Sequence, residues 1–128
     1  MNFQTAVRTV LLEKYATFSG RARRAELWWF VLFNIVVSII LSIIDRAIFG
    51  VSMETGMTNS VLGVIYSLAV LLPSITVGAR RLHDIGRSGW WLLIAFIPLI
   101  GALILIYWYI QPSQDGSNEH GPNPITGD

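Results

Sequence analysis

The side chains best suited to chemistry lie in one short segment, residues 80–89, which reads RRLHDIGRSG. An imidazole next to a carboxylate, with a hydroxyl nearby, could form a catalytic pair or triad. However, His83 and Asp84 are adjacent, and adjacent residues on a helix point about 100° apart, so a mutual hydrogen bond is not the expected geometry. Ser88 is better explained as the N-cap of a following helix. We therefore predict no catalytic site in this segment.

Sequence patterns of other catalytic sites are missing as well. The chain has no cysteine, and its histidines and carboxylates lack the spacing of metal ligands. It also has no glycine-rich phosphate loop, no nucleophile elbow and no His-Glu-x-x-His pattern. We predict that the protein is not an enzyme and binds no cofactor and no metal.

Arginine side chains form a second candidate site. Two groups of three are expected to meet at one membrane surface: Arg21, Arg23, Arg24, Arg80, Arg81 and Arg87. In one interpretation, which we favour, they only orient the chain in the membrane. In the other they bind an anionic lipid headgroup, such as cardiolipin or phosphatidylglycerol, or an acidic partner. Nucleic acid is not expected as a partner, because these basic residues are few and tied to the membrane.

Polar neighbours should support these arginines. We predict that Glu26 contacts a loop arginine, at position 80, 81 or 87, because a carboxylate near an apolar interface is costly without a partner. Arg80 and Asp84 are four residues apart on a continued helix and can also pair. The predicted structural cluster is Glu26, His83, Asp84 and Ser88.

Three apolar stretches must position these residues, and they decide the class of the protein. Residues 27–44, 61–79 and 90–110 hold 18, 19 and 21 residues without Asp, Glu, Lys, Arg or His. As helices they would be about 27 to 32 Å long, which matches a hydrocarbon core of about 30 Å. Apolar residues make up 53% of the chain and the mean hydropathy is +0.57. The sequence predicts an all-α membrane protein, a single domain over 1–128 with three transmembrane helices.

The basic residues predict the orientation of these helices. The net charge is only +1, yet eight of the nine Lys and Arg residues lie before the first stretch or between the second and third. The positive-inside rule then places the N-terminus in the cytoplasm. The loop 45–60 and the C-terminal tail are expected outside, which separates His120 from His83 by the membrane. A re-entrant third stretch, turning near Pro98, would instead return the tail to the cytoplasm, but we favour a full span.

The two ends of the chain differ in character. In residues 1–18, apolar side chains recur at three- and four-residue steps, which predicts an amphipathic helix lying in the membrane interface. Alternatively, this apolar stripe packs against the helix bundle. The tail, 111–128, holds three Pro and three Gly and is expected to be rich in loops.

Small and weakly polar residues recur along the first two stretches. Such stripes let membrane helices approach closely and hydrogen-bond across the contact. The predicted helix-packing face is Asn34, Ser38, Ser42, Gly63, Ser67, Ser74 and Gly78. The alternative is a polar pathway in a transporter or channel subunit, which we consider weaker because the stretches contain no ionisable residue. We predict a structural or accessory membrane protein, able to associate with itself or with another membrane protein.

Four segments also resemble a known family in the same order. Residues 18–28 read FSGRARRAELW, residues 80–91 read RRLHDIGRSGWW, residues 97–101 read IPLIG, and residues 116–124 read GSNEHGPNP. These segments resemble the signatures of the domain of unknown function 805 family, the YhaH-like small membrane proteins of bacteria. The resemblance implies a location in the bacterial inner (plasma) membrane and no established activity.

Overall fold

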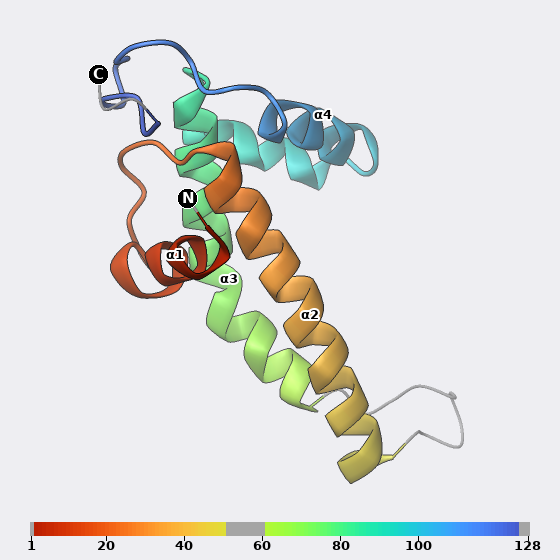
Figure 1. The fold of residues 1–128 in the computed structure, drawn as a ribbon. Coiled ribbons are helices and arrows are strands. Elements are labelled where there is room, and N and C mark those ends of the chain that lie inside the picture. Colours follow the sequence, from red (N-terminus) through yellow and green to blue (C-terminus); the bar gives the residue numbers. More distant parts are fainter. Residues whose placement is uncertain (1, 51–60, 126–128) are drawn as a thin grey trace.

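Two long helices form the frame of the molecule. The computed structural model describes residues 2–50 and 61–125. In it, α2 (Arg24–Phe49) and α3 (Val61–Asp84) lie side by side (Figure 1). They are about 39 and 36 Å long, enough to cross a hydrocarbon core of about 30 Å. The described elements are helical throughout, apart from one isolated bridge between Asn118 and Gly121, so the all-α class is confirmed.

Both helices are longer than the apolar stretches that predicted them. α2 ends before Gly50, whose φ of 73° suits a residue without a side chain. α3 continues past the apolar part to Asp84 and is followed by Gly86 at φ 81°. Pro73 lies inside α3 without ending it. The loop predicted over 45–60 lies mostly outside the described residues.

The third apolar stretch is a hairpin, so the prediction of one continuous helix over 90–110 is wrong. It consists of the 3₁₀-helix η2 (Gly89–Phe96) and the α-helix α4 (Ile100–Tyr109). Between them Pro98 cannot donate a backbone hydrogen bond, and Leu99 has a φ of 63°. The arms approach so closely that a Cβ on Gly101 would lie 1.6 Å from the carbonyl oxygen of Ile94. We call residues 89–109 the hairpin.

The hairpin returns the chain to the end of α3 from which it started. Each arm is about 15 Å long, half the thickness of a hydrocarbon core. The tail therefore lies beside the start of α2 and the end of α3 (Figure 1). The tail and the N-terminal segment share one end of the helix pair, and the prediction that they lie at opposite ends is wrong. The tail is rich in turns and bends, as predicted.

The N-terminal segment packs on the helix pair, as the second interpretation of its apolar stripe predicted. It is shorter than the predicted helix over 1–18, because α1 (Phe3–Arg8) and the π-helical turn η1 (Thr9–Glu13) end at residue 13. Phe3 meets the ring of Trp29 edge to face, with centroids 5.7 Å apart. Val10 is fully buried. A location in the membrane interface stays a prediction.

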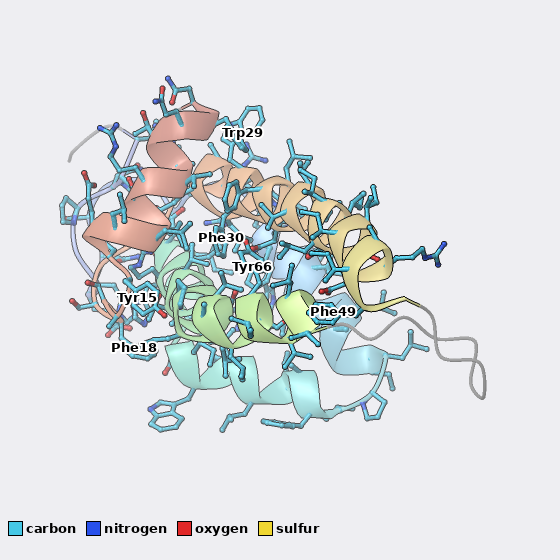
Figure 2. All side chains as sticks on the ribbon, turned by 90° about the horizontal axis from the view of Figure 1, so that it is seen from below. Tyr15, Phe18, Trp29, Phe30, Phe49 and Tyr66 are labelled. Atoms are coloured by element: carbon cyan, nitrogen blue, oxygen red, sulfur yellow. The ribbon has the colours of Figure 1, made fainter. Side chains whose placement is uncertain are left out.

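The core lies at the end of the molecule that holds the N-terminal segment. Val10, Ala22, Leu27, Phe30 and Val77 form its buried cluster. Figure 2 shows Phe30 between α2 and α3. Toward the other end, large apolar side chains face outward, as a bilayer would require.

Candidate functional site

Asp84 is the centre of a buried polar cluster at this end of the helix pair. Its Oδ1 accepts a hydrogen bond from Arg21 Nε at 2.9 Å, and its Oδ2 accepts one from Arg81 Nη1 at 2.6 Å. The hydroxyl of Ser113, in the tail, also donates to Oδ2. Asp84 is fully buried. One carboxylate thus joins the segment before α2, the end of α3 and the tail.

A second ion pair lies beside the first. Arg80 Nη1 contacts Glu26 Oε1 at 2.5 Å, and both side chains are buried. This confirms the predicted contact between Glu26 and a loop arginine. The predicted pairing of Arg80 with Asp84 is wrong, because Arg80 extends to α2 and leaves Asp84 to Arg21 and Arg81. We call Arg21, Glu26, Arg80, Arg81 and Asp84 the ion-pair cluster.

The cluster also holds the tail in place through hydrogen bonds to the backbone of the tail. Arg21 donates to the carbonyl oxygens of Gln114 at 2.7 Å, Gly116 at 2.7 Å and Gly121 at 3.3 Å. The backbone N–H of Gln114 donates to the carbonyl of Asp84 at 2.9 Å. A guanidinium has five N–H donors in a fixed plane, so it can hold a carboxylate and several carbonyls at once.

The cluster holds three guanidiniums and two carboxylates, so one positive charge is left for the carbonyl oxygens around it. The side chains of Arg21, Arg80 and Arg81 are buried, each with an exposed fraction of 1% or less. A lipid headgroup in the interface cannot reach them. Of the six predicted lipid-binding arginines, Arg23, Arg24 and Arg87 remain.

Two of the remaining arginines lie beside the end of the hairpin. Arg24 is exposed and donates from Nη1 to the carbonyl of Ile110 at 3.0 Å. Arg87 is exposed, and its guanidinium carbon lies 4.3 Å from the ring centroid of Trp108. Arg23 is partly exposed. The aromatic end of the hairpin and these two exposed arginines therefore share one surface.

The two histidines stack on each other, so their predicted separation by the membrane is wrong. The rings of His83 and His120 are 3.9 Å apart and nearly parallel, at 2°. This follows from the hairpin, which brings the tail back to α3. His83 Nδ1 lies 2.9 Å from the carbonyl oxygen of Gly20, so Nδ1 carries the proton. Among the described residues, no three imidazoles or carboxylates come together as metal ligands.

Ser88 caps η2, as predicted, by accepting a hydrogen bond from the backbone of Trp90 at 3.3 Å. His83 and Asp84 do not bond to each other's side chains, because each faces a different partner. In the described part of the chain, His83, Asp84 and Ser88 therefore make contacts that support the fold.

The residues of the predicted helix-packing face do not share one environment. Asn34 Oδ1 accepts a hydrogen bond from the hydroxyl of Tyr66 at 2.5 Å, which joins α2 to α3. Gly78 instead faces the hairpin, where a Cβ would lie 2.9 Å from the hydroxyl oxygen of Tyr109. Ser74 is exposed. The other four predicted residues line a groove of about 380 Å³ between α2 and α3: Ser38, Ser42, Gly63 and Ser67.

Asp45 is a buried carboxylate that the sequence analysis missed. It lies on α2, is fully buried, and accepts from the backbone N–H of Leu62 at 2.9 Å and of Gly63 at 3.1 Å. It thereby caps the start of α3, where N–H groups have no partner within the helix. The available signal was a carboxylate directly after an apolar stretch.

Comparison with known proteins assigns the chain to a family. The family model named "Protein of unknown function (DUF805)" matches residues 15–122. The chain belongs to this family. It is 40% identical to the inner membrane protein YhaH of Escherichia coli K12 over 114 residues, 89% of this chain and 92% of the relative. It is 39% identical to the inner membrane protein YhaI of the same strain over 117 residues, 91% of this chain and 93% of the relative. No solved structure matches the chain.

The matched region includes the whole ion-pair cluster and its tail contacts. In this DUF805 chain the segments 18–28, 80–91 and 116–124, which carry the sequence resemblance, meet at one end of the molecule. Their arginines and carboxylates hold the hairpin and the tail against the helix pair.

Proposed function

We propose that this protein is a non-enzymatic accessory protein of the bacterial inner membrane that binds anionic lipid headgroups at its cytoplasmic surface. In this arrangement α2 and α3 cross the bilayer, and the hairpin enters the cytoplasmic leaflet. The N-terminal segment and the tail both face the cytoplasm. The observation that carries the proposal is the division of the arginines into a buried set and an exposed pair, Arg24 and Arg87.

The exposed pair has the chemistry of a phosphate site. Both guanidiniums contact residues 108–110 at the aromatic end of the hairpin, and such aromatic residues prefer the headgroup level of a bilayer. Arg24 uses only one described hydrogen bond, to Ile110, which leaves N–H donors for a phosphate. A basic residue near an anionic leaflet gains about 1 kcal/mol.

The test is binding of the purified protein to vesicles with and without cardiolipin. The double substitution Arg24→Gln and Arg87→Gln should weaken the preference for cardiolipin about 30-fold, from two contributions of about 1 kcal/mol. Arg46→Gln is the matched control, because Arg46 is exposed on the last turn of α2, far from the hairpin. An unchanged preference in the double variant, or an equal loss in the control, would refute the proposal.

A transporter or channel subunit is the alternative, favoured by the polar groove between α2 and α3. The lining of the groove includes the polar residues Ser38, Ser42 and Asp45. Against it, Asn34 is bonded to Tyr66 and so serves helix pairing. Asn34→Leu distinguishes the two functions, since lost solute flux with normal thermal stability supports transport and lower stability supports pairing. The same groove is the face that we expect to meet a second copy or another membrane protein.

A further inference from the structure

An apolar pocket lies where the hairpin leaves α3. It has a volume of about 430 Å³, within the roughly 300–1,000 Å³ of small-molecule sites. Its apolar walls come from three segments, and they include Phe18, Ile75, Ala79, Leu92 and Leu93. Figure 2 shows Phe18 at the end of the N-terminal segment, on the side of α3 where η2 begins. Trp90 also lines the pocket and is 78% exposed, which suits the headgroup level of a bilayer.

Two polar side chains line the same pocket, His83 and Ser88. Because His83 Nδ1–H donates to Gly20, Nε2 of the neutral ring is a hydrogen-bond acceptor, and it has no such partner among the described residues. His83 lies beyond the apolar part of α3, and burial lowers its pKa, which favours the neutral ring. The Ser88 oxygen accepts from Trp90, and its own O–H can donate.

Among the described residues, the lining contains no Lys, Arg, Asp or Glu. A phosphate would therefore enter a site without a compensating cation, which is costly in an apolar surrounding. An uncharged lipid head with one hydroxyl and one carbonyl fits these two side chains. The hydroxyl can donate to His83 Nε2, and the carbonyl can accept from the O–H of Ser88.

We propose that this pocket binds an uncharged glycerol lipid with a free hydroxyl, of the diacylglycerol type. The hydroxyl donates to His83 Nε2, the ester carbonyl accepts from Ser88, and an acyl chain lies among the apolar walls. The site is separate from the exposed arginines Arg24 and Arg87 and goes beyond the proposed binding of anionic lipid.

The experiment is photo-crosslinking of the purified full-length protein with dioctanoylglycerol that carries a diazirine on one chain, followed by peptide mapping. Leu93→Trp fills the pocket at a position that is 55% exposed, so the fold should tolerate it. Leu103→Trp is the matched control, 57% exposed and outside the pocket lining. His83→Asn keeps a donor for Gly20 but removes the Nε2 acceptor.

We expect labelling of pocket residues in the natural protein and in Leu103→Trp, and none in Leu93→Trp. His83→Asn should label about fivefold less, the effect of losing one hydrogen bond. The same lipid with its hydroxyl methylated, and a diazirine phosphatidylglycerol, should both label more weakly. Equal labelling of Leu93→Trp would refute the site. Equal labelling by the methylated or the charged lipid would refute recognition of an uncharged hydroxyl head and leave only unspecific filling by an acyl chain. Thermal unfolding of each variant identifies any that misfold.

Discussion

At the scale of single residues, Asp84 has the most consequential position. It accepts from two arginines and from Ser113 while fully buried. Two cations and one hydroxyl offset the cost of taking this carboxylate out of water. Removing its charge leaves both guanidiniums without a counter-charge in an apolar surrounding.

The first prediction concerns this residue. Asp84→Asn should destabilise the protein by about 3–5 kcal/mol, the usual result of breaking a buried ion pair, and should release the tail. The measurement is thermal unfolding in detergent together with the rate of proteolysis after residue 110. Asp115→Asn, at an exposed position in the tail, is the control and should change neither. A stable Asp84→Asn protein with a protected tail would contradict the role of the cluster.

A second residue-scale prediction concerns pH. The pKa of His83 is lowered mainly by burial, with smaller contributions from His120 and Arg80. The unfolded chain therefore binds a proton more readily than the folded one, and stability should fall as the pH drops below about 6.5. Thermal unfolding between pH 7.5 and pH 5.5 measures this slope. His83→Phe keeps a ring against His120 but cannot titrate, so its slope should be flatter. An identical slope would show that other groups dominate.

At the scale of elements, α3 depends on α2 for its N-terminal end. α3 begins with two backbone N–H groups that donate to Asp45 of α2. A carboxylate is favourable at this end because the helix dipole is positive there.

The third prediction follows from this cap. Asp45→Ala should destabilise the protein by about 0.5–2 kcal/mol and speed hydrogen exchange at the start of α3. Arg46→Ala, the next residue along α2 and exposed, is the control. Equal exchange at residues 62 and 63 in both variants would show that the cap contributes nothing.

The fourth prediction concerns the hairpin. Gly101→Val places side-chain atoms where the carbonyl of Ile94 lies, so the arms must separate. Because the chain has no cysteine, spin labels on cysteines introduced at Leu93 and Leu103 can report the distance between the arms. The distance should rise in Gly101→Val and stay constant in Ala102→Val, whose side chain is exposed. An unchanged distance in both would contradict the close approach.

At the scale of the whole molecule, the hairpin decides on which side of the membrane the chain ends. The tail contacts Arg21, which precedes α2, and Asp84, which ends α3. All three must therefore lie in the same compartment. Eight of the nine Lys and Arg residues lie before the first apolar stretch or between the second and third, so we predict from the positive-inside rule that this compartment is the cytoplasm.

The fifth prediction is the resulting topology. A fluorescent reporter that folds only in the cytoplasm should be active when fused after residue 128, and alkaline phosphatase at the same position should be inactive. The same phosphatase inserted between residues 50 and 61 should be active and serves as the control. Activity of the phosphatase at the C-terminus would mean that residues 90–110 cross the bilayer.

The sequence by itself determined the helical class, the two long helices and the side-chain pairing of Glu26. Helices 27–44 and 61–79 follow from unbroken apolar length, a property that depends only on local composition. The contact between Glu26 and Arg80 follows from the cost of an unpaired carboxylate near an apolar phase. The end of α3 just before Gly86 and the cap at Ser88 follow from local backbone preferences.

Only the tertiary structure decided the hairpin, the side of the tail and the stacking of His83 on His120. Residues 90–110 are apolar enough for a span, and hydropathy has the same value for a straight helix and for two half-length arms. The difference comes from contacts between residues far apart in the chain, above all the tail carbonyls that bind Arg21 and the close approach of Gly101 to Ile94. Such a contact forms only when the fold brings two distant residues together. A local sequence pattern describes the surroundings of one of these residues and not the position of the other.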